Sequence, residues 1–563
     1  MGKHTTRAHA LRGVCLALVA LAECAAAAAQ SARGSDTRIR LNTVGFLPGH
    51  EKRASVAARF TDFSVAGDKS GAVVFRGKAA GPAHNADTNE DLYVADFSSL
   101  ERPGVYRLEI AGVGRSAPFR IAPDVYDEPF RAAVGAMYLW RCGTPVRADF
   151  RGVAYSHAAC HTEDAWLDFV GGGHTRRDGA GGWHDAGDYN KYVVNAGVTV
   201  GLMLLAWEQF GGRIQRAGLD AHGAAKGLPA YLGEVKWETD WLLKMQAADG
   251  SVYHKVSTRV FGPAGPPEDE KTPRYFTPWS SAATADFAAV TARSARAFRP
   301  FDPPYARRCL DAARAAYDFL RAHPESHRAD LRGFTTGAYQ TDDSDERLWA
   351  AAELWEATGE TAYLSDFEGR ARAFAEKFDL DWGWGNVKNL GMLTYLFSER
   401  AGRDAALVGQ VREGLLATAD ACVGLRDAHG YARPLGTKYY WGANGGVANT
   451  TVLLQSANLV APRRAYVEAA LDAVSHLFGR NYYGRSFVTG LGANPPLHPH
   501  FRPTLGQHGR PTWPGYLVGG GWPRATDWRD EEDDYRVNEV AVNWNAPLIY
   551  ALAGFLSGTP DTR

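Results

Sequence analysis

Cysteine and net charge are both scarce in this chain of 563 residues. Only four of its six cysteines lie beyond residue 30, too few for a disulfide framework, so the fold must depend on a hydrophobic core. A formal net charge of −1 provides no basic surface of the kind that binds nucleic acid or an anionic membrane. Beyond the N-terminus, no apolar stretch reaches the roughly 20 residues needed to cross a membrane. We therefore expect a globular protein with an uncharged partner.

The first residues have the pattern of a secretory signal peptide. Three basic residues precede an apolar run over 13–22, and alanines follow. Residues 1–30 are predicted to be cleaved, which leaves a secreted or periplasmic monomer with no membrane attachment. Cys24 then lies in the discarded peptide, and a lipoprotein anchored there is the alternative.

Aromatic side chains are abundant. The chain has 16 Trp, 24 Tyr and 25 Phe. Most aromatic residues in a protein of this size pack in the core, but their flat faces also suit the stacking of sugar rings. Together with the near-zero charge, this composition favours a neutral carbohydrate partner.

Residues 38–122 read as a small β-domain. Short segments alternate apolar and polar positions, for example at 54–60, 92–97 and 104–110, and Gly, Pro, Asp and Asn separate them. A length of roughly 85 residues suits an immunoglobulin-like β-sandwich. An all-β module of another topology is the alternative.

The region 126–558 is predicted to be helical, because apolar residues there recur three and four positions apart. Twelve such segments suggest six helical hairpins closed into an α/α barrel, and the lack of a short sequence repeat argues against an open solenoid. The expected helices lie near 126–141, 193–211, 228–247, 280–298, 303–323, 344–357, 361–377, 385–400, 404–422, 446–459, 463–478 and 539–556.

Two connections between these helices, at 171–192 and 480–538, are long enough to suggest a functional role. The first contains Asp185 and Asp188, flanked by glycines and placed directly before a helix. Two carboxylates at this spacing can converge on one water molecule and accept its proton, which is the task of a general base. Helix capping by either aspartate is the alternative.

Glu539 lies at the end of the second long connection, where the acidic run 530–534 gives way to an apolar helix. Partial burial at such a boundary raises the pKa of a carboxyl group and favours a proton donor. The alternative is an acid in the first turn of a helix, stabilised by the helix dipole.

Taken together, the two regions resemble the signatures of glycoside hydrolase family 9. The Asp-Ala-Gly-Asp sequence at 185–188 is one of three matches, which span the helical region from end to end. The resemblance implies an (α/α)6 barrel over 126–558, preceded at 38–122 by the immunoglobulin-like domain of one branch of the family. The other two matches are Trp528, Asp530, Tyr535, Glu539, Ala541, Asn545 and Ala546, and Ser486, Val488, Thr489, Gly492, Asn494, Pro499, His500 and Arg502.

The resemblance also implies roles for the carboxylates. Asp188 is similar to the catalytic base, Asp185 to its partner in holding the water, and Glu539 to the general acid. Attack by water from the face opposite the acid needs carboxyl groups roughly 6.5 to 9.5 Å apart and gives inversion at the anomeric carbon.

The same likeness suggests which residues bind the sugar. His500, Arg502 and Tyr535 resemble the residues that contact it at the cleavage point. Trp441 lies in a loop where the family has an aromatic stacking platform, although a tryptophan packed in the core is the alternative.

Two metal sites are predicted, and no organic cofactor. Thiolate and imidazole are the usual ligands of a closed zinc site. A disulfide with two unrelated histidines is the alternative, but a structural zinc site of the same family branch resembles the set Cys142, Cys160, His161 and His184. A calcium site of the family resembles the oxygen donors Asp345, Glu346 and Asp381, which could equally be solvated acids at helix ends. Cys309 and Cys422 are expected to be buried thiols.

The expected substrate is a β-1,4-glucan of the cellulose or mixed-linkage type, cut internally. An exo-acting glucosidase or cellobiohydrolase, or an exo-glucosaminidase, would use the same catalytic groups. Two other classes compete with this prediction. A zinc hydrolase would need an open coordination position on the metal, and a noncatalytic sugar-binding protein would not need the three carboxylates.

Overall fold

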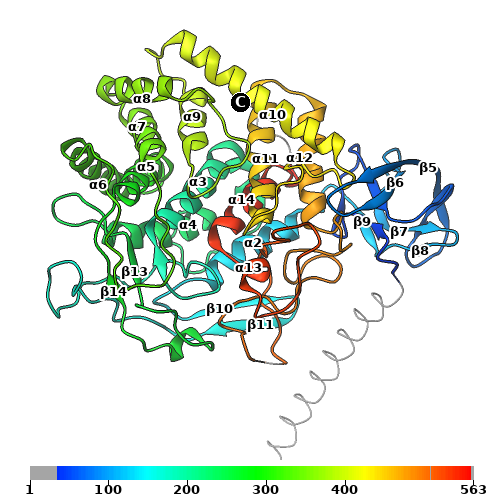
Figure 1. Cartoon of the computed structure of the whole chain (residues 1–563), viewed down its shortest axis with the longest axis horizontal. Helices are drawn as coiled ribbons and strands as arrows, with labels where there is room; N and C mark the ends of the chain where they lie inside the picture. Colours follow the sequence, from blue (N-terminus) through cyan, green and yellow to red (C-terminus); the bar gives the residue numbers. More distant parts are fainter. Residues whose placement is uncertain (1–34, 508, 559–563) are drawn as a thin grey trace, which may run out of the picture.

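The structure is a computed structural model that describes residues 35–507 and 509–558. A small β-rich body, blue in Figure 1, lies beside a large helical body that contains the other described residues. The predicted signal peptide at 1–30, with Cys24, lies outside the described residues.

The N-terminal body is a β-sandwich, as predicted. The long strand β5 belongs to both of its layers, because residues 73–78 pair with β4 and residues 79–85 pair with β6. Inward side chains such as Val56, Val65 and Leu108 have no solvent exposure and form one core between the layers. One layer holds β1 (Ile39–Arg40), β3 (Arg53–Val56) and β6 (Glu90–Asp96), and the other holds β4 (Asp62–Gly67), β7 (Gly104–Ile110), β8 (Gly114–Arg115), β9 (Phe119–Ile121) and β2 (Gly45–Phe46), with β5 (Val73–Asn85) joining them.

The helical body has an inner and an outer set of helices, and each predicted helical segment has its counterpart among the described residues. The prediction of an (α/α)6 barrel is therefore confirmed. The inner helices are α3 (Val193–Arg216), α5 (Ser281–Phe298), α7 (Ser344–Thr358), α9 (Lys388–Phe397), α11 (Ala443–Val460) and α14 (Val542–Ala553). The outer helices are α2 (Asp127–Leu139), α4 (Ala230–Lys244), α6 (Pro303–Ala322), α8 (Thr361–Ala373), α10 (Ala405–Ala428) and α12 (Arg464–Leu477).

Burial distinguishes the two sets of helices. The inner helix α5 is rich in alanine and buries nearly every residue, since neighbours cover it on all sides. The outer helix α6 buries only a stripe that includes Tyr305, Cys309 and Ala313, as expected of a helix with one face in water. Helix α3 is long and apolar enough to cross a membrane, but 89% of its most apolar window is buried, which is typical of a core helix.

Short strands that the helical periodicity did not predict organise the loops before the inner helices. Strand β12 (Lys191–Tyr192) runs directly into α3 and pairs with β13 (Lys255–Ser257), which pairs with β14 (Tyr275–Phe276). The hairpin of β10 (Val146–Phe150) and β11 (Val153–His157) follows α2. The three-stranded sheet of β12, β13 and β14 fixes the end of the first long loop against the 250–276 segment.

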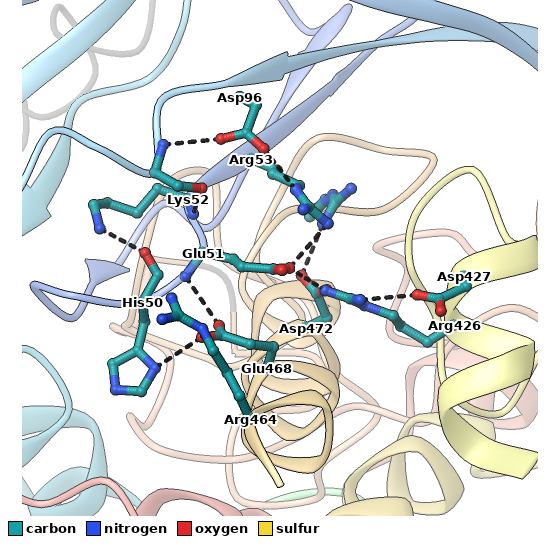
Figure 2. A network of polar contacts seen from close by, with 12 residues as sticks. His50, Glu51, Lys52, Arg53, Asp96, Arg426, Asp427, Arg464, Glu468 and Asp472 are labelled. Carbon is teal, nitrogen blue, oxygen red and sulfur yellow. Dashed lines mark hydrogen bonds and ion pairs between the residues drawn. The ribbon is translucent and has the colours of Figure 1, made fainter. Parts of the chain in front are cut away.

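The β-domain docks against α10 and α12 through a network of charged groups (Figure 2). Arg426 of α10 pairs with Glu51 of the β-domain and, at 2.6 Å, with Asp472 of α12. Glu468 accepts a hydrogen bond from the Glu51 amide at 2.9 Å and pairs with His50 at 3.2 Å. Since Arg426, Glu468 and Asp472 are largely buried, each depends on these partners for its solvation.

Candidate active site

Asp185 lies at the point where the first long loop meets the start of α14. Its amide donates to the Asn190 carbonyl at 3.0 Å, and its carbonyl accepts from Val542 at 2.9 Å. Its carboxylate accepts from Asn195 Nδ2 at 2.6 Å and from the Tyr339 hydroxyl at 2.8 Å. Burial and the nearby charge of Asp188 raise the pKa of Asp185, although these two donors oppose the rise.

Asp188 lies on the same loop and is 5% exposed. Its Oδ2 accepts from Asn190 Nδ2 at 2.7 Å and from the Tyr192 hydroxyl at 3.1 Å. Tyr192 also accepts a hydrogen bond from the Gly337 amide at 3.1 Å. Tyr192 therefore connects Asp188 to the segment that carries Tyr339, the donor to Asp185. The two carboxylates are held by the same hydrogen-bonded segments.

Glu539 approaches this pair from the other end of the sequence. It follows the short helix α13 (Tyr535–Asn538), and its backbone pairs with His500 in a short parallel bridge. A Cβ on Gly187 would lie 2.5 Å from the His500 carbonyl and 3.2 Å from Glu539 Oε1, so only glycine permits this approach. Burial, followed by the charges of Asp188 and Asp185, raises the pKa of Glu539 well above its usual value.

One cavity of about 680 Å³ contains all three carboxylates and the four residues predicted to bind sugar. Trp441 and Tyr535 are 45% and 46% exposed, and their ring centroids are 5.3 Å apart, so Trp441 is not a core residue. The lining comprises Asp185, Ala186, Asp188, Tyr192, Phe261, Gly337, Ala338, Tyr339, Trp384, Trp441, His500, Arg502, Tyr535, Glu539, Ala541, Asn543 and Trp544.

His500 and Arg502 are fixed by backbone contacts. His500 Nδ1 lies 2.7 Å from the Glu532 carbonyl and must donate to it, which settles the tautomer of the neutral ring. Arg502 Nε donates to the Gly262 carbonyl at 3.1 Å, and its guanidinium lies 5.4 Å from the ring centre of Phe261.

Sequence reasoning missed several residues of the cavity. Tyr192, Tyr339 and Asn195 hold the aspartates, and Phe261, Trp384 and Trp544 add aromatic walls. Only Tyr192 and Asn195, close to Asp188 in sequence, could have been suspected.

The four predicted zinc ligands form a cluster whose donor atoms all lie within 4.8 Å of one another. Cys142 Sγ is 3.6 Å from His161 Nδ1, and Cys160 Sγ is 3.6 Å from His184 Nε2. All four cysteines of the described residues are free and buried, which excludes the disulfide alternative and agrees with the prediction for Cys309 and Cys422. The donor set and its compactness fit a tetrahedral zinc ion.

The cluster connects distant segments. Cys142 donates its amide to the Gly182 carbonyl at 2.7 Å, and His184 is adjacent to Asp185. Glu270 Oε2 lies 3.4 Å from the outward Nε2 of His161, the position of a carboxylate that orients a metal-binding histidine. A bound ion would brace the loop that presents the two aspartates.

The predicted calcium ligands are only partly brought together. Asp345 and Glu346 are buried at the start of α7, where Asp345 accepts from the Lys388 amide at 3.2 Å. Asp381 instead accepts from the Tyr440 hydroxyl at 2.7 Å and pairs with Lys438. Burial and the charges of Asp345 and Asp286 raise the pKa of Glu346, which identifies Asp286 as an acidic neighbour that the sequence did not suggest.

The chain belongs to glycosyl hydrolase family 9, whose model matches residues 126–552, and a model described as "cellulase N-terminal ig-like domain" matches residues 35–115. It is 54% identical to Endoglucanase D of Acetivibrio thermocellus, with 93% of this chain and 84% of that protein aligned. It is 33% identical to a xyloglucan-specific endo-β-1,4-glucanase of Bacteroides ovatus, over 92% of this chain and 93% of that protein. A crystal structure of a metagenome-derived family 9 endoglucanase superposes with a TM-score of 0.86 at 34% identity, over 92% of this chain and 99% of that one.

Proposed function

We propose that this protein is an endo-acting β-1,4-glucanase that hydrolyses glucan chains by single displacement, with inversion at the anomeric carbon. The observation that carries the proposal is the shared cavity, which is lined by Asp185, Asp188 and Glu539 together with the exposed rings of Trp441 and Tyr535. Relatives aligned over most of their length are named endoglucanases, which supports the same conclusion.

Glu539 is the proposed general acid. Its raised pKa favours the protonated carboxyl over an ordinary glutamate's carboxylate, so it can protonate the departing glycosidic oxygen. It reaches the cavity from the second long loop, whereas the two aspartates belong to the first.

Asp188 is the proposed general base. Together with Asp185 it holds the attacking water and accepts its proton as the water adds to the anomeric carbon. Hydrogen bonds from Tyr192 and Tyr339 fix the two carboxylates in orientation before the substrate arrives. The proton taken by Asp188 and the proton lost by Glu539 balance over one turnover.

The aromatic rings are proposed to bind the glucan through stacking. Trp441 and Tyr535 present flat faces to the cavity, while Arg502 and His500 supply charged and polar contacts close to Glu539. We expect His500 and Arg502 to bind hydroxyl groups of the sugar at the cleavage point.

The metal at the Cys142, Cys160, His161 and His184 cluster is proposed to be zinc. Four protein ligands fill its coordination positions, so it would brace the catalytic loop and activate no water. Zinc removal, verified by metal analysis, should lower the melting temperature before it affects turnover. If the catalytic rate changed when another metal replaced zinc, the result would favour a zinc hydrolase instead.

Calcium is proposed at Asp345 and Glu346, with Asp286 in place of Asp381 as the third acid. The argument is electrostatic, since burial and the charges of Asp345 and Asp286 raise the pKa of Glu346, and buried carboxyl groups call for a cation or for protons. We further propose that residues 1–30 direct export and that the mature enzyme acts outside the cytoplasm as a monomer.

The test is a time course on carboxymethylcellulose, mixed-linkage glucan, cello-oligosaccharides and chitosan oligosaccharides. Viscosity that falls faster than reducing ends accumulate would support endo action. Monosaccharide release at constant viscosity would instead indicate an exo-acting glucosidase or glucosaminidase. Proton NMR of the first product supports inversion if the α-anomer appears first and contradicts it if the β-anomer does.

A further inference from the structure

The tip of the β5–β6 hairpin reaches the segment of the barrel that leads to Trp441. Asp87, in the turn at 86–89, accepts hydrogen bonds on Oδ2 from His429 Nε2 at 3.0 Å and from the Tyr439 hydroxyl. The Asp87 side chain is only 9% exposed and that of His429 only 4%. The contact between the two domains at this point is therefore desolvated.

The partners of Asp87 are themselves fixed. His429 Nδ1 accepts from the Tyr431 amide at 3.1 Å, so the neutral ring carries its proton on Nε2, where it faces Asp87. Burial alone would raise the pKa of Asp87, but the hydrogen bonds from His429 and Tyr439, together with the nearby charge of Arg433, outweigh it and lower the pKa to about 2. The carboxylate is therefore charged, and both bonds are charge-assisted.

Gly430 shows how closely the hairpin and this segment fit. Its amide donates to Asn85 Oδ1 at 3.0 Å, and its carbonyl accepts from Ser55 Oγ at 2.7 Å. A Cβ at this position would lie 2.5 Å from Cδ1 of Leu92 in the β-domain. The barrel segment has no room to shift toward the hairpin.

Tyr439 is two residues before the platform at Trp441. The Arg433 guanidinium covers the Tyr439 ring at 4.3 Å, and Tyr440 is held on another side by Asp381. After Trp441 the chain turns at Gly442, with φ of +85° and the Trp544 indole 2.4 Å from where a Cβ would be. Contacts before and after Trp441 in the chain thus determine the orientation of its side chain. The β-domain supplies one of them, the hydrogen bond between Asp87 and Tyr439.

We propose that Asp87 is a positioning residue, through which the β-domain holds the 429–441 segment so that Trp441 faces the substrate cavity. None of the residues that line the cavity belongs to the β-domain, so Asp87 acts on binding only through Tyr439 and His429. The inference rests on the proposed function, because it assumes that Trp441 binds the glucan.

The test compares Asp87→Ala and Asp87→Asn with wild type in steady-state hydrolysis of cellopentaose by the full chain. Trp441 is expected to bind the glucan equally well in the ground state and in the transition state. Its misplacement in Asp87→Ala should therefore raise KM about threefold to tenfold and leave kcat within about twofold. Asp87→Asn keeps one acceptor oxygen and should restore part of the affinity.

Glu51→Gln is the matched control. Glu51 is also an acidic residue of the β-domain that crosses the boundary, but its partner is Arg426 on α10 (Figure 2). Both variants should lower the melting temperature, and only Asp87→Ala should raise KM. An equal rise in KM for Glu51→Gln would mean that general loosening of the domain contact is responsible and would overturn the proposal.

A second comparison uses Trp441→Ala. If Asp87 acts by orienting Trp441, then Asp87→Ala should add nothing to KM once the indole is gone. An undiminished rise in that background overturns the proposal. Should Asp87→Ala fail to fold, Tyr439→Phe removes only the hydroxyl of the same contact and carries the same expectation.

Failure of the proposed function would look different. In that case wild type would hydrolyse none of the glucans, whereas an active wild type with unchanged KM in Asp87→Ala and Tyr439→Phe rejects only the positioning role.

Discussion

The barrel holds two groups of three acidic residues that are solvated in different ways. In the cavity, Asp185 and Asp188 each accept two side-chain hydrogen bonds, and Glu539 lies at the wall of an open space. In the core, within the described part of the chain, no donor reaches either oxygen of Asp286 or of Glu346, and both residues have no solvent exposure.

This difference shows that buried carboxyl groups can have two different roles, one in catalysis and one in stability. Donors placed around the cavity aspartates stabilise charge where a reaction needs a base, and the burial of Glu539 retains the proton that the reaction needs. Asp286 and Glu346 have no donor among the described residues, so only a cation or bound protons can compensate their burial. The first group is arranged for chemistry, and the second is expected to affect stability alone.

The largest expected effect is on turnover in Glu539→Gln. The amide cannot donate the proton to the leaving group, so kcat should fall by about 10² to 10⁴ while the melting temperature hardly changes. Asp188→Asn should behave similarly because it removes the base. Rates close to wild type in either variant, with the fold verified by circular dichroism, would refute the assignment of these carboxylates.

Tyr339→Phe should have a smaller effect on the same step. Removing the hydroxyl takes one of the two donors from Asp185, and the loss of one buried hydrogen bond predicts a fall in kcat of about tenfold. Single-turnover kinetics would show whether the chemical step is slowed. A change confined to KM would mean that Tyr339 contacts the sugar and has little influence on the aspartates.

Glu346→Gln tests the core group. If a cation is bound there, the variant should lose about 2 to 3 kcal/mol of stability, seen as a melting temperature lower by several degrees in calcium, with kcat unchanged. Chelator should lower the melting temperature of wild type and not of the variant. A wild type free of calcium would point to bound protons; with the pKa of Glu346 raised, its stability would then fall as pH rises above the ordinary range of a glutamate.

The smallest effect concerns pH. The positive charge of Arg502 opposes the rise in the pKa of Glu539, so Arg502→Gln should raise that pKa further. Activity is lost as pH rises through the pKa of the acid, and the alkaline limb of kcat/KM should therefore move to higher pH in the variant. A limb that moves to lower pH would mean that another group controls it.

The sequence predicted the elements that periodicity and local motifs encode. The helix positions follow from apolar spacing, and the loop of Asp185 and Asp188 is local to one motif. Contacts made across the fold were not predictable in this way, since Tyr339 reaches Asp185 from 154 positions away. For the same reason no local pattern indicated that Asp381 would pair with Lys438 while Asp286 lies near Glu346.

The charged boundary in Figure 2 bears on how such domains can be exchanged between proteins. Arg426 and Asp472 pair with each other, and Glu468 pairs with Arg464 of its own helix at 3.1 Å. Glu468 also accepts a hydrogen bond from the Glu51 amide and pairs with His50, and both of these partners belong to the β-domain. Cutting the chain before the barrel would uncover these groups together with His429 and Tyr439. The N-terminal domain and the barrel therefore form one folding unit. A domain grafted in place of the N-terminal one would have to reproduce its acidic contacts to the barrel residue by residue.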